Sequence, residues 1–316
     1  MEEKKQQLLV SIAVITYNSS ATILETLDSI FNQTYPCIEL IISDDCSSDN
    51  TLAICRKWLL SHVERFIRAE IIVSEKNTGV AGNMNRAERA CQGSWIKTIG
   101  GDDKLLPECI SDYIQFTEGK PNAKYIFSRV VPFGGNKKIV ELYEKGKIFD
   151  YDFFSKTTEQ QLEAFVLTDV HIPAITLFYN RLFAAERGIK FDERLPMIED
   201  EPLWINVLKA GVHLYFLDKP TVMYRVGDSN ALSSPSHVMS PKQFESICRF
   251  FFYYKFPVRY ERDPDDAINR MLDFILFNYN SAYSSEKGKD FKYSLSYRIF
   301  WALTWPFRKV KAILKV

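Results

Sequence analysis

The stretch I-K-T-I-G-G-D-D-K-L-L-P, residues 96–107, joins an apolar run typical of a strand to two glycines and two adjacent aspartates. Neighbouring carboxylates repel each other, so they must be solvated, paired with cations or bound to a metal. Such a pair at the end of a buried strand is therefore either an ordinary turn or a metal site. The rest of the chain has to decide between these two interpretations.

The residues before this stretch alternate between apolar runs and helical patterns. Strands are predicted at 8–17, 38–45, 69–74 and 94–100, and helices at 22–31, 47–60 and 80–93. Thr22 to Glu25 (T-I-L-E) fits a capping box, and Gly93 fits a helix stop. Continuous apolar strands separated by helices favour a parallel sheet covered on both faces. We therefore predict an α/β fold with a Rossmann-like, mostly parallel sheet and flanking helices.

Polar residues follow each predicted strand, at the edge where ligands bind in open parallel sheets. These residues are Thr16, Tyr17 and Asn18 after the first strand, Asp44 and Asp45 after the second, Asn77 and Gly79 after the third, and Asp102 and Asp103 after the fourth. All four groups are expected to converge on one edge of the sheet.

After residue 106 the pattern changes, so we divide the chain into parts at 1–106, 107–235 and 240–316. Residues 123–150 suggest strands and turns, 212–226 a pair of strands, and the part from Ser240 onward a helical extension. Residues 307–316 predict a basic amphipathic helix, which is either a peripheral membrane anchor or a helix packed on the body. Both interpretations stay open from the sequence.

Composition excludes several classes of protein. The 40 acidic and 40 basic residues balance, so no overall field favours nucleic acid. The 6 cysteines form no C-x-x-C pair, which favours a reducing compartment and no zinc site. Neither a signal peptide nor a spanning segment is predicted, so we expect a cytoplasmic protein. If residues 307–316 are an anchor, the protein is peripheral on the inner face of the cytoplasmic membrane.

Each acidic cluster also has an ordinary explanation. The segment after Asp45 includes residues that can cap a helix, and Glu199, Asp200 and Glu201 would be favoured in a first helical turn by the helix dipole. G-G-D-D also resembles the acid turns of polymerase palms and cyclic-dinucleotide cyclases, but those need an antiparallel hairpin. The chain contains neither G-x-G-x-x-G nor G-x-x-x-x-G-K-[ST], the phosphate loops of dinucleotide oxidoreductases and P-loop enzymes.

Four segments taken together resemble the GT-A glycosyltransferases of family 2. They are S-I-A-V-I-T-Y-N, S-I-F-N-Q-T-Y-P-C-I-E-L-I-I-S-D-D-C-S-S-D-N-T, N-T-G-V-A-G-N-M-N-R-A and G-S-W-I-K-T-I-G-G-D-D-K-L-L-P. The similarity covers residues 9–107 and continues more loosely to about 230 through I-E-D-E-P-L-W-I-N-V-L-K-A-G. It implies a GT-A fold, with a nucleotide-sugar half over 1–106 and an acceptor half over 107–235.

The resemblance also implies an activity: inverting, metal-dependent transfer of a sugar from a nucleotide-diphosphate donor, most commonly a UDP-sugar, to a saccharide or lipid-linked saccharide. The metal would be Mn²⁺ or Mg²⁺. Thr16, Tyr17, Asn18, Asn77 and Gly79 would line the nucleotide pocket. Asp45 would accept from the base, Asp102 would approach the ribose and the metal, Asp103 would hold the metal, Arg225 would face the diphosphate, and Asp200 would be the general base.

The chain departs from the family pattern at two places. Gly100 stands where D-x-D-D motifs have a leading acid, and Tyr224-Arg225-Val226-Gly227-Asp228 has no histidine of the Y-R-x-H type. Either Asp228 substitutes or that contact is absent. A catalytically inactive nucleotide-sugar-binding module is therefore the alternative, and a nucleotidyltransferase is disfavoured because T-Y-N-S-S-A-T has no basic residue.

Overall fold

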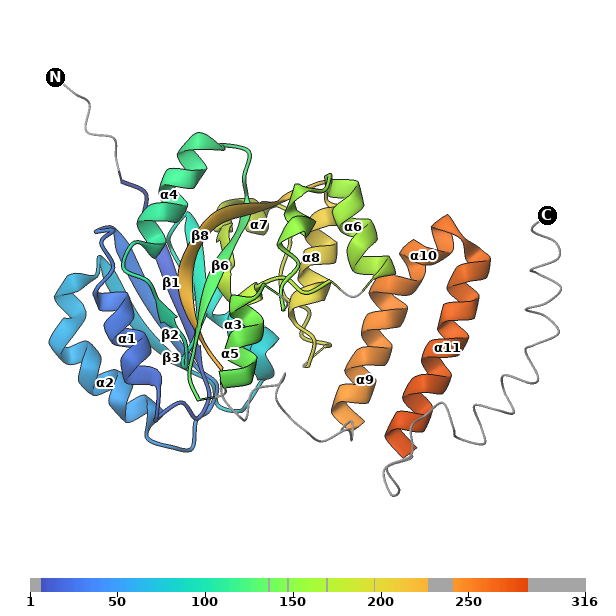
Figure 1. Ribbon diagram of the computed structural model, residues 1–316. Helices are drawn as coiled ribbons and strands as arrows, with labels where there is room; N and C mark the ends of the chain where they lie inside the picture. The colour runs from blue at the N-terminus through green and yellow to red at the C-terminus, as the bar shows by residue number, and fades with distance from the viewer. Residues whose placement is uncertain are drawn as a thin grey trace. The chain divides into compact units, whose positions relative to one another are not determined.

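The computed structural model describes residues 7–226, apart from 136, 147, 169 and 196, and residues 241–283. The chain divides into two compact units, Met1–Ser234 and Pro235–Val316. The first unit contains a single sheet flanked by helices, and the second unit is helical in its described part (Figure 1).

The first part of the first unit alternates strands and helices along the chain, as the sequence predicts. Its elements are β1 (Val10–Thr16), α1 (Ile23–Phe31), β2 (Ile38–Asp44), α2 (Thr51–His62), η1 (Val63–Arg65), β3 (Arg68–Val73), α3 (Gly79–Ala90) and β4 (Trp95–Gly100). Strand β1 pairs in parallel with β2 and with β4, and β2 pairs in parallel with β3.

The second part completes the same sheet and covers it. Its elements are β5 (Lys104–Leu105), α4 (Cys109–Gly119), β6 (Tyr125–Phe133), α5 (Lys137–Glu144), η2 (Tyr151–Ser155), α6 (Thr158–Leu167), η3 (Ala174–Thr176), β7 (Phe178–Asn180), α7 (Arg181–Glu186), α8 (Asp200–Lys209) and β8 (Leu214–Arg225). The strand order is β3-β2-β1-β4-β7-β6-β8-β5. Because β7 is antiparallel to β4 and β6, and β5 is antiparallel to β8, the sheet is mixed.

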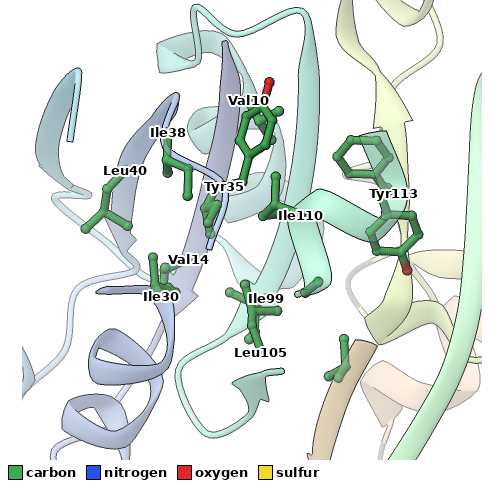
Figure 2. Packing of buried hydrophobic residues seen from close by; sticks show 14 of the residues in the cluster. Val10, Val14, Ile30, Tyr35, Ile38, Leu40, Ile99, Leu105, Ile110 and Tyr113 are labelled. Carbon is green, nitrogen blue, oxygen red and sulfur yellow. The ribbon is translucent and has the colours of Figure 1, made fainter. Parts of the chain in front are cut away.

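One hydrophobic core lies between one face of the sheet and helices α1, α2 and α4 (Figure 2). Alternate residues of β1 and β2, such as Val10, Val14, Ile38 and Leu40, are fully buried there because side chains alternate between the faces of a strand. Ile30 of α1 packs against them from the helix side. Helix α3 contacts β1 and β2 through other residues. Both faces of these central strands are therefore covered, which explains their continuous apolar sequence.

Four local predictions are wrong in the structure. Thr22 makes no capping bond to the start of α1, and Glu25 pairs with Lys104 and Arg225 instead of closing a capping box. Helix α3 ends at Ala90, before Gly93. A Cβ at Gly93 would lie 2.6 Å from the Ser11 amide nitrogen, so this glycine permits close approach to β1.

The other two errors concern elements of the second part. Residues 137–144 form helix α5, although the stretch 123–150 was expected to hold only strands and turns. The strand pair expected at 212–226 is one long strand, β8, whose register against β6 shifts between Ser128 and Val130. Strand β6 tolerates this irregularity where Arg129 lies opposite Pro220, a residue without an amide hydrogen.

The described part of the second unit consists of α9 (Pro241–Phe250), a π-helical segment η4 (Phe251–Lys255), α10 (Phe256–Arg262) and α11 (Pro264–Tyr283). Within the described residues, no helix combines the length and the apolar character needed to cross a membrane. The predicted basic helix at 307–316 and Asp228 lie outside the described residues.

Candidate active site

The polar residues predicted at the strand ends lie together at one edge of the sheet. In the parallel register Thr16 of β1 is opposite Asp44 of β2, and Ile15 is opposite Gly100 of β4. Two successive carbonyls of β1 accept hydrogen bonds from the segments that follow β4 and β2. Ile15 O accepts from Gly101 N at 3.0 Å, and Thr16 O accepts from Asp45 N at 2.9 Å. Both aspartate pairs therefore leave the sheet from neighbouring positions.

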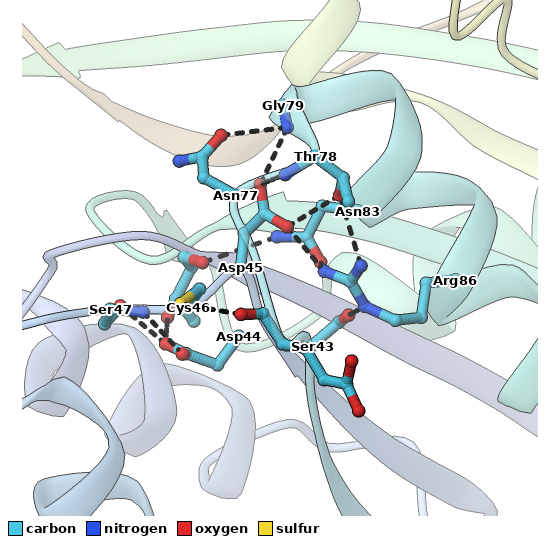
Figure 3. Close-up of polar contacts among 12 residues, drawn as sticks. Ser43, Asp44, Asp45, Cys46, Ser47, Asn77, Thr78, Gly79, Asn83 and Arg86 are labelled. Carbon is cyan, nitrogen blue, oxygen red and sulfur yellow. Dashed lines mark hydrogen bonds and ion pairs between the residues drawn. The ribbon is translucent and has the colours of Figure 1, made fainter.

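Asp45 is a buried hub of hydrogen bonds (Figure 3). Its Oδ2 accepts from the backbone amides of Thr78 and Gly79 at 2.9 and 2.8 Å. Its Oδ1 accepts from the Thr78 hydroxyl at 2.7 Å and from Arg86 Nη2 at 2.8 Å. A carboxylate has about four lone-pair positions, so internal donors already fill the acceptor capacity of this side chain.

Arg86 of α3 is the charged member of this network. Its Nε donates to Ser43 Oγ at 3.1 Å, and its Nη2 also donates to Asn83 Oδ1 at 2.9 Å. Asn83 in turn donates to Thr16 O at 3.4 Å. The guanidinium therefore links β1, β2 and the first turns of α3, and it neutralises the charge of Asp45 at a buried position.

The other predicted residues of this region shape loops around the same edge. Asn18 has a φ of 51°, and its Oδ1 accepts from Ser48 N at 2.9 Å. The Asn77 side chain accepts from Gly79 N at 3.1 Å, and Gly79 has a φ of 77°, which a residue with a Cβ rarely adopts. Tyr17 is 51% exposed. Its ring is available to a planar ligand.

Asp44 has an internal function. It accepts from Thr16 Oγ1 at 2.9 Å and from Ser47 N and Oγ at 2.9 and 2.6 Å. These bonds fix the loop between β2 and α2, so the ordinary explanation suffices for this acid.

Asp102 and Asp103 lie in a different electrostatic environment. Burial, and after it repulsion from Asp102, raises the pKa of Asp103 to about 7. Burial also raises the pKa of Asp102 above its usual range. For Asp103 Oδ1 the structure gives one donor, the Arg225 backbone amide at 2.7 Å. The pair thus carries negative charge that its surroundings compensate only in part.

The two glycines before this pair make room for groups of the protein itself. A Cβ at Gly100 would lie 2.9 Å from Asp102 Oδ1, and a Cβ at Gly101 would lie 3.0 Å from Ser19 Oγ. Both contacts are closer than real Cβ atoms normally make. The glycines therefore allow residues 100–105, which we call the acid turn, to fold tightly against the loop after β1.

Arg225 at the end of β8 is anchored to this turn. Its Nε donates to Asp102 O at 2.8 Å, its Nη2 is 3.1 Å from Glu25 Oε1, and its guanidinium lies 4.5 Å from the centre of the Phe133 ring. These contacts hold the positive charge beside Asp102 and Asp103.

Asp200 is the first residue of α8, and its charge and those of the acid pair all act on Tyr224. Burial, and then repulsion from Glu199 and Glu201, raises the pKa of Asp200 well above its usual range. The pKa of Tyr224 is raised by burial and then by the charge of Asp103, with smaller contributions from Asp102 and Asp200. One phenol therefore lies within electrostatic reach of all three acids. Tyr143 of α5 hydrogen-bonds to it.

The carboxylates at this edge fit a divalent cation that substrate and water also ligate. Among the described residues, no group of three histidine, cysteine, aspartate or glutamate side chains is arranged to hold a metal. Mg²⁺ and similar ions at phosphate sites need only one or two carboxylates, because phosphate oxygens and water supply the other ligands. A partly uncompensated pair such as Asp102 and Asp103 meets that requirement.

Sequence reasoning missed three residues of this region, Arg86, Asn83 and Tyr143. Asn83 and Arg86 are three residues apart on α3, so they share a helix face, and this spacing could have identified them. Tyr143 lies on a helix that was not predicted, and its ring centre is 5.6 Å from that of Tyr224. Its proximity depends on tertiary packing alone.

Comparison with known proteins assigns the chain to a class. The sequence matches the family model of glycosyl transferase family 2 over residues 11–185. It is 29% identical over 221 residues to WfaP of Escherichia coli, a UDP-Glc:alpha-D-GlcNAc-diphosphoundecaprenol beta-1,3-glucosyltransferase, with 69% of this chain and 77% of that protein covered. It is 26% identical over 273 residues to the amylovoran biosynthesis glycosyltransferase AmsB of Erwinia amylovora, covering 80% and 85% of the two chains.

The fold is similar to that of a solved structure. The crystal structure of S. aureus TarS 1-349 in complex with UDP-GlcNAc matches with a TM-score of 0.59 and 18% identity. The match covers 87% of this chain and 82% of that chain.

Proposed function

The chain belongs to glycosyl transferase family 2, and on this premise we propose that it transfers a sugar from a UDP-sugar to a hydroxyl of a saccharide or lipid-linked saccharide acceptor. The observation that carries the proposal is the edge of the sheet where two aspartate pairs of different character lie on either side of the end of β1. The compensated pair borders a loop region suited to a nucleotide. The uncompensated pair provides negative charge where a cation and a diphosphate would bind.

For the nucleotide, we assign the loops after β1 and β3. Tyr17 offers an exposed ring for stacking, while Thr16, Asn18, Asn77 and Gly79 form the surrounding walls. For Asp45 to accept from the base, one of its present donors must give way. The Thr78 hydroxyl and the Arg86 guanidinium can rotate aside, whereas the two backbone amides are fixed at the start of α3.

For the diphosphate, we assign Asp103 as the main metal ligand, with Asp102 beside it toward the ribose. A bound Mn²⁺ or Mg²⁺ would stabilise the negative charge that develops on the leaving diphosphate. Arg225 adds a fixed positive charge at the same end of the site. The raised pKa of Asp103, about 7, means that the carboxyl is held partly protonated until a cation favours its ionised form.

For proton transfer, we assign Asp200 as the general base that accepts the proton of the acceptor hydroxyl. Its raised pKa makes its carboxylate a stronger base than an exposed aspartate. Attack by the acceptor opposite the leaving diphosphate inverts the anomeric carbon and needs no covalent nucleophile.

The test is a panel of nucleotide-sugars, measured by thermal stabilisation with and without Mn²⁺ and then by transfer to saccharide and undecaprenyl-diphosphate-linked acceptors. We expect a UDP-sugar to stabilise the protein in a Mn²⁺-dependent manner. Asp200→Asn should retain that stabilisation and lose transfer by about 100-fold or more. Full transfer by Asp200→Asn would refute its assignment, and the absence of stabilisation by any nucleotide-sugar would refute the donor site.

Two features favour a second candidate, a nucleotide-sugar-binding module without turnover. Gly100 replaces the leading acid of the common motif, and the segment after Arg225 has no histidine at the usual place. UDP stabilisation that is independent of Mn²⁺, with no transfer to any acceptor, would support this candidate. The lipid-linked acceptor agrees with the name of WfaP, and membrane contact through residues 307–316 stays a prediction.

A further inference from the structure

Helix α1 presents a polar stripe toward the acid turn. Thr22, Glu25, Thr26 and Ser29 are spaced at i, i+3, i+4 and i+7, so they lie along one face of the helix. The other face supplies Ile23, Leu27 and Ile30 to the hydrophobic core. The residues of the stripe do not belong to this hydrophobic cluster, and their side chains contact the acid turn instead.

Three members of the stripe bind alternate residues of the acid turn. Thr22 Oγ1 donates to Gly101 O at 2.8 Å, and Thr26 Oγ1 donates to Asp103 O at 2.7 Å. Ser29 Oγ accepts from Leu105 N at 3.0 Å. Residues 101, 103 and 105 therefore each present a backbone group to α1.

The intervening residues face β8. Asp102 O accepts from Arg225 Nε at 2.8 Å, and Lys104 is paired with Met223 in the sheet. The acid turn is thus held between a helix on one side and a strand on the other. Thr26 is fully buried, and its hydroxyl is the donor that the structure gives for the carbonyl of Asp103.

Glu25 connects helix α1 to the acid turn and to strand β8. Its carboxylate lies 3.1 Å from Lys104 Nζ and 3.1 Å from Arg225 Nη2. Both cations also lie over the Phe133 ring, Lys104 at 4.3 Å and Arg225 at 4.5 Å from its centre. Glu25 is about half exposed, so an ion pair here contributes little to folding stability. The main effect of Glu25 is to fix the position of the Arg225 side chain.

Arg225 also contacts the proposed metal ligand, because its backbone amide donates to Asp103 Oδ1 at 2.7 Å. We infer that the polar stripe of α1 positions the acid turn for the cation: Thr26 fixes the backbone of Asp103, and Glu25 holds the end of β8 that contacts its carboxylate. This inference rests on the proposed function. It makes Thr26 and Glu25 positioning residues, since Thr26 acts through the backbone of Asp103 and Glu25 acts through Arg225.

The first test replaces Thr26 by Val, which has the same shape without the hydroxyl, and by Ser, which keeps the hydroxyl. The readout is the Mn²⁺ concentration that gives half-maximal thermal stabilisation of the full chain in the presence of UDP. Changes next to metal ligands commonly weaken metal affinity by about 10- to 100-fold, so we expect an increase of about 10-fold for Thr26→Val. Thr26→Ser should restore most of the affinity, and UDP binding without metal should not change.

A matched control is Thr117→Val. Thr117 is also a buried helical threonine, and its hydroxyl donates to Ile114 O within α4 at 2.7 Å, away from the acid turn. Thr117→Val should lower thermal stability. It should not change the Mn²⁺ requirement, by which we mean the Mn²⁺ concentration that gives half-maximal thermal stabilisation. An unchanged Mn²⁺ requirement in Thr26→Val would overturn the inference, and so would an equal increase in Thr117→Val.

The second test uses exposed residues, so it does not depend on Thr26→Val folding. Glu25→Gln should raise the Mn²⁺ requirement by about three- to tenfold, while Glu141→Gln, which breaks an exposed pair with Lys145 on α5, should not. Equal behaviour of these two variants would contradict the role of Glu25. A wild-type protein that shows neither Mn²⁺-dependent stabilisation nor transfer would refute the proposed function itself, whereas a responsive wild type with unaffected variants would refute only the positioning role.

Discussion

Two pairs of adjacent aspartates lie at the ends of β2 and β4, the strands on either side of β1, yet their surroundings differ. Asp45 is buried and accepts four hydrogen bonds from Thr78, Gly79 and Arg86. Asp103 is equally buried, but its pKa is raised to about 7 by burial and by Asp102. The same Asp-Asp pair in the sequence therefore gives an acid with a full set of donors in one place and an only partly compensated acid in the other.

The difference shows how the fold divides stability from function. A carboxylate with a full set of donors stabilises the loops around it and has little capacity left for a ligand. A buried carboxylate with few donors costs free energy and gains from a cation. On this basis we propose that Asp45 organises the nucleotide region and that Asp103 binds a metal. Four measurements test this contrast.

The largest expected effect is on transfer by Asp103→Asn. The amide removes the charge that would hold the metal, so we expect the transfer rate to fall by about 100- to 1,000-fold. The same change removes repulsion from Asp102, so the free energy of unfolding without metal should stay equal or rise. Transfer assays and denaturant unfolding of the same preparation measure both quantities. A variant that is active, or that is clearly less stable, would contradict the assignment.

Asp45→Asn should have the opposite effect on stability. An amide NH₂ group would face the donors of Thr78 or Gly79 and leave Arg86 without its buried partner. We expect the free energy of unfolding to fall by about 3 kcal/mol, as is usual when one side of a buried ion pair is lost. Urea unfolding measures this change. If Asp45→Asn were as stable as wild type, the hub interpretation of Asp45 would be wrong.

The third prediction concerns the pH dependence of stability without metal. The folded pKa of Asp103 is about 7, above its ordinary value of 3.8, so between these values the folded state binds more protons than the unfolded state. The contribution of this group to stability is therefore present at low pH and is lost as the pH rises toward 7. The loss approaches about 1.4 kcal/mol per pH unit between the two values. The free energy of unfolding should therefore fall more steeply with rising pH in wild type than in Asp103→Asn. Parallel pH profiles of the two proteins would argue against a raised pKa of Asp103.

The smallest expected effect is that of Gly100→Ala. The added Cβ would lie 2.9 Å from Asp102 Oδ1, so that carboxylate must turn away from its present position. We expect a two- to fivefold increase in the Mn²⁺ requirement, which corresponds to about 0.4–1 kcal/mol. Gly119→Ala is the control, because a Cβ there meets nothing within 4 Å. An equal response to both changes would remove the special role of Gly100.

Much of the fold could be predicted because the relevant patterns are local. The apolar runs that became β1, β2, β3 and β4 are each bounded by helical patterns, and the acids after β2 and β4 follow from the chain order. The second part was less predictable, since β7 is only three residues long and lies antiparallel between β4 and β6. Short strands have too few residues to show a period.

The capping box is an instructive error. Thr22 and Glu25 have the right residue types and spacing for a cap, and both side chains are polar for a reason. That reason is the acid turn about 80 residues further along the chain, which Thr22 contacts at Gly101 and Glu25 at Lys104. A local motif and a long-range contact can have the same sequence signature.

The alternation of strands and helices, the edge where polar residues gather and the resemblance to family 2 could all be read from the order of residues. Which of the two buried acids has a full set of donors could be read only from the folded chain. The donors to Asp45 come from Thr78 to Arg86, and the amide that contacts Asp103 comes from Arg225. Strand pairing brings these groups together across more than 30 residues of chain, and the charge balance of a buried carboxylate depends on such neighbours rather than on the residues beside it in sequence.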